Sequence, residues 1–338
     1  MFKKWINRIT LATAVAVTGG AAGLQAEEQK TLNFGIISTE SSSNLKNVWE
    51  PFLEDMSAKL DMEVKGFFAP DYAGIIQAMR FDKVDIAWYG NKSAMEAVDR
   101  AGGEVVVQTV AADGSPGYWS LMIVHKDRTD LNTIDDMLAN AKDLNFGNGD
   151  PNSTSGFLVP GYYIFAKNGI NPKKAFKRTL NSSHETNAMA VANKQVDVAT
   201  FNTESMERLQ INFPEKADNL KVIWKSPLIP SDPLVWRKNL PDETKQKVYS
   251  FLMDYGTTND ENELNILAAL QWAPFRASSN DQLIPIRQLE LFKQKAAIEN
   301  DDNYSAQEKT QKLAEIKSQL AGLERRTAAL DAARETSN

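Results

Sequence analysis

The sequence Val84-Asp85-Ile86-Ala87 returns in nearly the same form as Val196-Asp197-Val198-Ala199, 112 residues further along the chain. Both segments have the short, apolar character of a buried strand. The same offset aligns further pairs: Phe34-Gly35 with Phe146-Gly147, Ser41-Ser42-Ser43 with Ser153-Thr154-Ser155, Tyr72 with His184, and Ser93 with Ser205. Several separated matches at one offset indicate an internal duplication; chance similarity between two strands of this common type is the alternative.

Strand and helix patterns alternate around the first copy. Apolar runs of strand length occupy residues 32–37, 63–68 and 84–89, and apolar residues at helical spacing fill 45–60 and 73–81. This alternation predicts an α/β fold of two lobes, each a mostly parallel sheet flanked by helices. Ligands of such sheets gather beyond the carboxyl ends of the strands, so we expect the binding site in a cleft between the lobes.

The N-terminal segment predicts export. Lys3, Lys4 and Arg8 precede a short apolar run and small residues that end at Ala26, which is the pattern of a signal peptide cleaved near Ala26. The apolar run is about half the ~20 residues that a membrane span needs. Without residues 1–26, 35 of the 38 Lys and Arg residues remain against 44 acidic ones, and there is no cysteine. This balance fits the periplasm and argues against a nucleic-acid partner.

A run of hydroxyl side chains stands at a predicted helix start. Ser153, Thr154 and Ser155 follow a predicted strand at 144–146 and precede a helical pattern. Unpaired backbone N–H groups and hydroxyls at a helix start bind a tetrahedral oxyanion without Lys or Arg. Helix capping by Ser153 is the simpler alternative, but one cap needs one hydroxyl. The segment has no Walker A or dinucleotide-binding pattern, so nucleotide binding is not indicated.

Four further polar residues fall where the cleft is expected. Tyr72 and His184 each start the next helix of their lobe, and both side chains can donate a hydrogen bond. Glu204 follows the strand that ends at Phe201, and Asp232 lies on the return from the second lobe to the first. Surface charge or helix capping is the alternative role for each of them. If both acids face the cleft, they attract a cation. Together with the expected oxyanion site, this predicts a ligand that carries one negative and one positive group.

The sequence offers no hydrolytic constellation. It has no cysteine and no Gly-x-Ser-x-Gly motif, and its histidines, His125 and His184, are too few for a typical zinc enzyme. We therefore predict no catalytic residue, metal ion or cofactor. Carboxylate-based chemistry stays open, so a periplasmic phosphohydrolase that uses the same hydroxyl turn is the rival from another class.

The turn at 150–156, the helix start at 71–72 and the strand at 84–90 resemble those of the periplasmic phosphonate-binding proteins of ABC transporters, which are type II periplasmic solute-binding proteins. The resemblance runs from about Thr31 to Arg276. It implies a hinged receptor, not an enzyme, that closes on an alkylphosphonate such as 2-aminoethylphosphonate and delivers it to a membrane permease. A receptor for phosphate, phosphite or sulfate is the alternative.

The resemblance also implies roles for single residues and a division of the chain. The phosphonate would be held by Ser153, Thr154, Ser155, Tyr72 and His184, and the ammonium by Glu204 and Asp232, with Tyr118 closing the pocket. The expected parts are lobe 1 at 27–125 and 227–285, lobe 2 at 126–226, and a helical C-terminal extension at 286–338.

The C-terminal extension carries a heptad-like seam. The apolar positions step by three and four residues: Leu313, Ile316, Leu320, Leu323, Thr327 and Leu330. Such a seam predicts either a homodimer or a helix packed on its own lobe, and both stay open.

Overall fold

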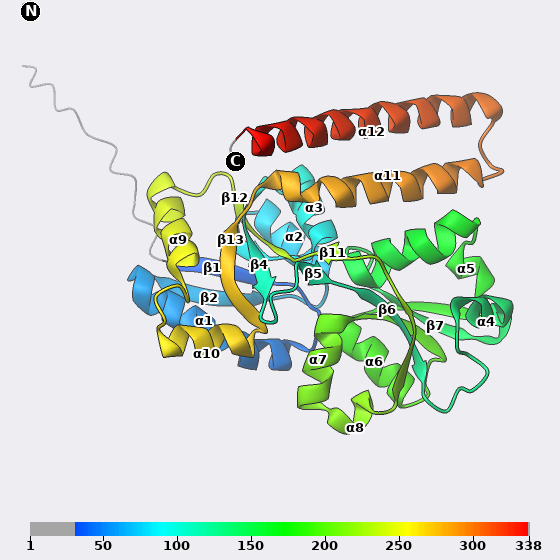
Figure 1. Cartoon of the computed structure of the whole chain (residues 1–338), viewed down its shortest axis with the longest axis horizontal. Coiled ribbons are helices and arrows are strands. Elements are labelled where there is room, and N and C mark those ends of the chain that lie inside the picture. Colours follow the sequence, from blue (N-terminus) through cyan, green and yellow to red (C-terminus); the bar gives the residue numbers. More distant parts are fainter. Residues whose placement is uncertain (1–30, 337–338) are drawn as a thin grey trace, which may run out of the picture.

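The computed structural model describes residues 31–336, and the predicted signal peptide at 1–26 lies outside the described residues. The chain has the predicted α/β fold with two lobes, each built on one sheet (Figure 1). Lobe 1 contains a six-stranded sheet of order β13-β4-β12-β3-β1-β2. Its strands are β1 (Thr31–Ile36), β2 (Glu63–Phe68), β3 (Ile86–Trp88), β4 (Gly103–Ala111), β12 (Pro233–Arg237) and β13 (Trp272–Ala277).

Lobe 2 contains a five-stranded sheet of order β10-β6-β9-β7-β8. Its strands are β6 (Ser120–His125), β7 (Asn145–Gly149), β8 (Arg178–Ser182), β9 (Val198–Asn202) and β10 (Leu220–Lys225). A third, two-stranded sheet pairs β5 (Gly117–Tyr118) with β11 (Ile229–Pro230) at the two places where the chain passes between the lobes.

Helices surround both sheets. Lobe 1 carries α1 (Ser42–Leu60), α2 (Tyr72–Arg80), α3 (Asn91–Arg100), α9 (Asp242–Asp254), α10 (Glu261–Ala269) and the 3-10 turn η5 (Asn280–Leu283). Lobe 2 carries α4 (Ile134–Ala139), α5 (Pro172–Ala175), α6 (His184–Ala192), α7 (Thr203–Asn212), α8 (Pro214–Ala217), the 3-10 turns η1 (Ala141–Asp143) and η4 (Ala166–Asn168), and the π-helical turns η2 (Thr154–Leu158) and η3 (Gly161–Phe165). No helix within residues 31–336 combines the length and apolar character of a membrane span.

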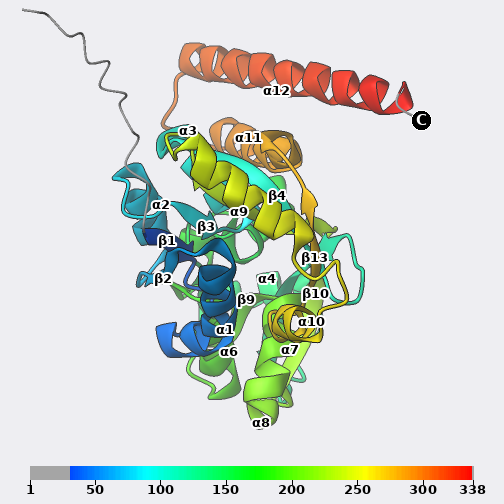
Figure 2. The same cartoon turned by 90° about the vertical axis from the view of Figure 1, so that its left-hand side faces the viewer.

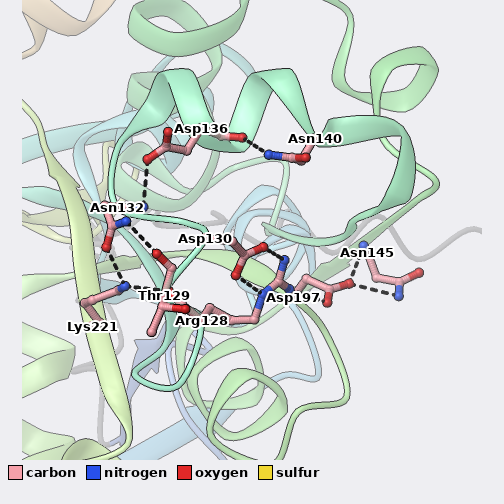
Figure 3. Close-up of polar contacts among 9 residues, drawn as sticks. All are labelled: Arg128, Thr129, Asp130, Asn132, Asp136, Asn140, Asn145, Asp197 and Lys221. Atoms are coloured by element: carbon pink, nitrogen blue, oxygen red, sulfur yellow. Dashed lines mark hydrogen bonds and ion pairs between the residues drawn. The ribbon is translucent and has the colours of Figure 1, made fainter.

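The duplication is present in the hydrogen bonding of the two sheets. β1 pairs in parallel with β2 and β3, and β7 pairs in parallel with β8 and β9. Phe34 lies opposite Ile86, and Phe146 lies opposite Val198, so the offset of 112 residues is kept. Asp85 and Asp197 also match, since each carboxylate accepts from the backbone N–H of an asparagine on the neighbouring strand at 2.8 Å (Figure 3 shows Asp197).

The prediction that the sheets are mostly parallel is wrong. Every pairing of β4, β6, β10, β12 and β13 with a neighbour in these two sheets is antiparallel. The reason lies in the crossovers: β6 begins at Ser120 opposite Asn202, and Leu234 of β12 lies opposite Trp88. Both strands therefore enter beside the carboxyl ends of β9 and β3 and run backwards through the sheet.

The crossovers also correct the expected limits of the lobes. β6 belongs to the five-stranded sheet, so the expected boundary of lobe 1 after residue 125 is too late. A fully buried strand has the same apolar pattern in either sheet, and the sequence alone therefore does not assign it. We propose that lobe 1 ends near Tyr118 and resumes near Ile229, where β5 and β11 pair.

An aromatic core fixes the strand ends of lobe 1 that face the cleft. Trp49 of α1 packs against Phe34, Trp88 and Trp272, with ring centroids 5.3, 5.5 and 5.3 Å away. Because α1 continues through Pro51, one helix supplies this whole buried face. Truncating a buried aromatic ring of this kind to alanine costs about 3–5 kcal/mol. Trp88 is thus held firmly at the carboxyl end of β3.

The C-terminal extension forms two helices, α11 (Ile284–Glu299) and α12 (Ala306–Glu335). α12 runs alongside α11 at the edge of the molecule (Figures 1 and 2). α11 touches both lobes, since Arg287 pairs with Asp99 at 2.6 Å and the ring of Phe292 lies 6.1 Å from that of Tyr162. Along α12 only Ile316 is buried.

Candidate functional site

The hydroxyl turn of lobe 2 follows β7 and forms the start of η2, which Ser153 caps. Ser153, Thr154 and Ser155 are each 2% exposed, so the three hydroxyls are withdrawn from bulk solvent. Ser153 caps the next turn, because its Oγ accepts from the backbone N–H of Gly156 at 2.9 Å. A Cβ on Gly149 would lie 2.5 Å from the backbone of Gly156, so only glycine allows this close approach.

Each hydroxyl oxygen of the turn already accepts a hydrogen bond. Thr154 Oγ1 accepts from the backbone N–H of Lys92 at 2.8 Å, and Ser155 Oγ accepts from Asn202 Nδ2 at 3.1 Å. Ser153 uses its oxygen for the cap. A hydroxyl that accepts in this way can direct its O–H toward another acceptor. The turn is therefore arranged to donate hydrogen bonds to an oxyanion.

Tyr72 and His184 stand at equivalent helix starts in the two lobes. Tyr72 is the first residue of α2, which Asp71 caps, and His184 is the first residue of α6, which Ser183 caps. Both side chains are buried. His184 Nε2 lies 3.3 Å from Ser153 Oγ and 3.4 Å from Ser155 Oγ. The histidine thus lies behind the serine hydroxyls.

The titration of these two residues follows from their burial. Burial lowers the pKa of His184 to about 3, and the charge of Arg208 acts in the same direction. Burial, with the charges of Asp150 and Asp232, raises the pKa of Tyr72 above its usual value. His184 is therefore neutral and Tyr72 is protonated at neutral pH, so both offer dipoles rather than charges.

Two carboxylates face the same space from opposite lobes. Asp232, between β11 and β12, is 4% exposed, and its Oδ1 accepts from Tyr118 Oη at 3.0 Å and from Asn91 Nδ2 at 3.3 Å. Glu204 lies in the first turn of α7. Burial raises the pKa of both carboxyls, and for Asp232 the charge of Glu204 raises it further. A cation placed between them would be strongly favoured.

Most of these groups surround one cavity between the lobes. Of the predicted site residues, all except His184 line it, and His184 contacts two that do. The full lining is Ile37, Thr39, Tyr72, Trp88, Gly90, Tyr118, Ser153, Thr154, Ser155, Asn202, Glu204, Arg208 and Asp232. The predicted residues are thus brought together, and their roles toward a ligand stay predictions.

Bonds between the lobes close this cavity. Besides the bond from Lys92 to Thr154, the backbone N–H of Tyr72 donates to Asp150 Oδ2 at 3.3 Å, and that of Glu185 donates to the carbonyl of Thr39 at 3.2 Å. Tyr72, Lys92 and Thr39 belong to lobe 1, and their partners belong to lobe 2. The two lobes are therefore in contact around the site.

Several lining residues were not predicted from the sequence. Trp88 Nε1 and Thr39 Oγ1 are buried and have no hydrogen-bond partner among residues 31–336. Unpaired buried polar atoms are costly, so these two atoms are candidates for ligand or water contacts. Their places at the carboxyl ends of β3 and after β1 are the signal that could have found them. Arg208, four residues after Glu204, had no such signal.

The serines of lobe 1 that align with the hydroxyl turn do not reach the cavity. Ser41, Ser42 and Ser43 are all exposed and none lines it. Within residues 31–336, no group of three or more His, Cys, Asp or Glu side chains is placed to hold a metal ion.

Comparison with known proteins decides the family. The family described as the periplasmic phosphonate substrate-binding protein of ABC transporters matches residues 34–283. The chain belongs to this family. Its membership implies a periplasmic location, a small phosphonate ligand and a permease partner. Family members are substrate-binding transport proteins, so the prediction of a binding protein rather than an enzyme is confirmed.

The relatives of this phosphonate-binding protein agree. It is 63% identical over 306 residues to the phosphonates-binding periplasmic protein of Escherichia coli (strain K12), covering 90% of this chain and 89% of the relative. The crystal structure of a binding protein of an ABC phosphonate transporter from Pseudomonas aeruginosa matches with a TM-score of 0.88 and 66% identity, covering 90% of this chain and 100% of that one. PhnD1 from Prochlorococcus marinus, solved in complex with methylphosphonate, shares the fold (TM-score 0.69, 24% identity, 77% of this chain and 97% of that one).

Proposed function

We propose that this protein captures short aminoalkylphosphonates, with 2-aminoethylphosphonate as its preferred ligand. The observation that carries the proposal is a single cavity lined by hydroxyl donors from lobe 2 and by two carboxylates, Glu204 and Asp232. A phosphonate dianion needs donors, and a primary ammonium needs acceptors. The cavity supplies both kinds of group without a metal ion.

In this proposal the phosphonate oxygens lie at the turn of Ser153, Thr154 and Ser155. Each hydroxyl oxygen accepts a hydrogen bond from an N–H group, which fixes its orientation. The three side chains therefore need little reorganisation when the anion binds. Tyr72 donates a further hydrogen bond from lobe 1, and His184 supports the two serines from behind. Because the anion accepts hydrogen bonds from both lobes, its binding stabilises the closed arrangement of the two lobes.

The ammonium group lies between Glu204 and Asp232. Its positive charge offsets the burial that raises the pKa of both carboxyls, so binding favours their ionised forms. Tyr118 fixes Asp232 by donating its hydroxyl to Oδ1. A phosphate, phosphite or sulfate receptor, the alternative from the sequence, would bring no cation to these two acids.

The wider setting of the function follows from the same family. We propose that residues 1–26 direct export and are removed near Ala26, and that the closed, loaded protein delivers its ligand to the membrane permease. We also propose that α12 contributes to a homodimer, because its apolar positions are only partly covered by α11. Sedimentation of the mature protein with and without residues 304–338 tests the homodimer, which should be lost on truncation.

The test of ligand class compares two ligands on the same variants. Glu204→Gln and Asp232→Asn should weaken 2-aminoethylphosphonate much more than methylphosphonate, because only the first ligand carries an ammonium. Glu215→Gln, which removes an exposed carboxylate on α8, is the control and should change neither affinity. Equal losses for both ligands in the two cavity variants would remove these acids from amine recognition.

A further inference from the structure

Arg208 is a cation with its side chain only 14% exposed, and it lines a cavity whose proposed ligand brings its own positive charge. It lies on α7 of lobe 2, one helical turn after Glu204, and lines the ligand cavity. Its Nε donates to the carboxylate of Glu40, and its Nη1 donates to Gln271 Oε1 at 3.1 Å. Glu40 and Gln271 belong to lobe 1, so the guanidinium joins the lobes at one end of the cleft.

Arg208 also separates the ligand cavity from a second one. The second cavity is lined by Trp49, Trp88 and Trp272 with neighbouring apolar side chains, and by the charged pair Arg208 and Glu40. Arg208 and Trp88 line both spaces, whereas Glu40 lines only the outer one. The guanidinium of Arg208 therefore borders both the ligand cavity and the tryptophan-lined cavity, and we call it the wall between them.

This wall resists displacement. A buried arginine that loses its carboxylate partner keeps a charge without compensation, at a cost of several kcal/mol. Burial lowers the pKa of Arg208, but the charges of Glu40 and Glu204 outweigh that effect and raise it, so the side chain stays charged. An alkyl chain that pushes against it gains little from the apolar space beyond while the ion pair is intact.

We propose that the Arg208–Glu40 pair is the end wall of the ligand cavity and sets the maximum length of the phosphonate substituent. The inference rests on the proposed function of the cavity. Phosphonates with short substituents fit in front of the guanidinium. Those with longer chains are rejected unless the pair is removed, after which the tryptophan-lined cavity accepts the additional methylene groups.

The experiment measures an affinity ratio by calorimetry. The ligands are 2-aminoethylphosphonate and 4-aminobutylphosphonate, together with methylphosphonate and pentylphosphonate as a pair without an amine. The proteins are the wild type, Arg208→Ala/Glu40→Gln, and the control Arg287→Ala, whose ion pair with Asp99 does not border the cleft. In the double variant the preference for the short ligand should fall by about tenfold or more in both pairs, since one methylene in a pocket is worth about tenfold or more.

The outcomes separate the inference from the proposed function. If the double variant binds short and long ligands more weakly by the same factor, Arg208 only stabilises closure and the inference is overturned. If the double variant does not fold, the single variant Glu40→Gln, which breaks the ion pair, replaces it. An unchanged ratio of short-ligand to long-ligand affinity in that variant overturns the inference equally. A wild type that discriminates length in the alkyl pair but ignores the amine contradicts the proposed ligand and leaves the wall in place.

Discussion

The two lobes share one internal framework and differ in the turn that faces the cleft. In lobe 1, Asp85 accepts from the N–H of Asn33 at 2.8 Å and pairs with Arg237 at 2.8 Å. In lobe 2, Asp197 accepts from Asn145 and pairs with Arg128 at the same distances (Figure 3). The arginines come from corresponding strands, since β12 and β6 each run antiparallel beside the strand that follows the aspartate. Arg237 ends β12, whereas Arg128 lies three residues beyond the end of β6. The duplicated framework therefore includes the antiparallel strand, and the exact position of the arginine differs between the lobes.

The serine caps show how the copies diverged. Ser41 Oγ accepts from the N–H of Asn44 at 3.3 Å, and Ser153 Oγ accepts from the N–H of Gly156 at 2.9 Å, 112 residues further on. Ser41 is exposed, whereas Ser153 is 2% exposed beside His184. The cap is thus common to both lobes, and the burial of the hydroxyl turn is specific to lobe 2.

Removing the matched aspartates, Asp85 and Asp197, should have the largest effect on the free energy of unfolding. The loss should be greater in lobe 1 than in lobe 2. Asp85→Ala should lower the free energy of unfolding by about 3–5 kcal/mol, because it removes the carboxylate from a buried ion pair. Asp197→Ala should cost only about 1–2 kcal/mol, because Arg128 keeps Asp130 at 2.7 Å and its side chain is 28% exposed. Urea denaturation followed by circular dichroism measures both, and equal losses would contradict the difference.

Removing the equivalent serines should separate ligand binding from capping. Ser153→Ala, Thr154→Ala and Ser155→Ala should each weaken every phosphonate by about 1–3 kcal/mol, because the proposed binding mode has each hydroxyl donating to a buried charge. Ser41→Ala should leave affinity unchanged and cost about 1 kcal/mol of stability, as the loss of an exposed cap does. Calorimetric titration is the measurement. Unchanged affinity in all three lobe 2 variants would exclude the turn.

The helix starts at Tyr72 and His184 should differ in their dependence on pH. Below the ordinary histidine pKa the unfolded chain takes up a proton that His184, with a pKa of about 3, does not. The ligand-free protein should therefore lose about 1.4 kcal/mol of stability per pH unit from its histidine as the pH falls from about 6.5 toward 3. His184→Gln should remove this component, while Tyr72→Phe keeps it. Denaturation at pH 7.5 and 4.5 checks this, and parallel curves for wild type and His184→Gln would refute it.

The smallest effect concerns a matched pair of strained residues. Asp82 and Lys194 lie 112 residues apart, and both have positive φ, 55° and 59°. Lys194→Gly should stabilise the protein by about 0.5 kcal/mol, since a left-handed conformation is costly for lysine and the pair with Asp127 that is lost is exposed and contributes little. Asp82→Gly should gain less, because aspartate tolerates this conformation and Asp82 accepts from Asn239. A larger gain at Asp82 would reverse the comparison.

Local sequence patterns were enough for the duplicated framework and much of the cavity. The strand at 84–87 and its copy were predicted because buried parallel strands are continuous apolar runs. Ser153 was predicted from a run of hydroxyls at a helix start, Glu204 from its place after a strand, and Asp232 from its place on the return between the lobes. These features depend on a few neighbouring residues, and each copy supports the other.

Long-range packing decided the rest. Arg208 enters the cavity only because Glu40 and Gln271 meet it from the other lobe, and no local pattern indicates those contacts. Trp88 was assigned to a strand, but its unpaired Nε1 is visible only when the wall around it is known. β6 was assigned to the wrong lobe for the same reason, since its buried pattern fits either sheet.

The most direct test of the account is calorimetric titration of the mature protein with 2-aminoethylphosphonate, methylphosphonate, phosphate and sulfate, after unfolding and refolding to remove carried-over ligand. A cavity with an oxyanion turn and two carboxylates should bind 2-aminoethylphosphonate most tightly and methylphosphonate more weakly, with little binding of phosphate or sulfate. Tightest binding of phosphate or sulfate would discard the ammonium site, and no heat from any of the four would contradict the assignment of the cavity.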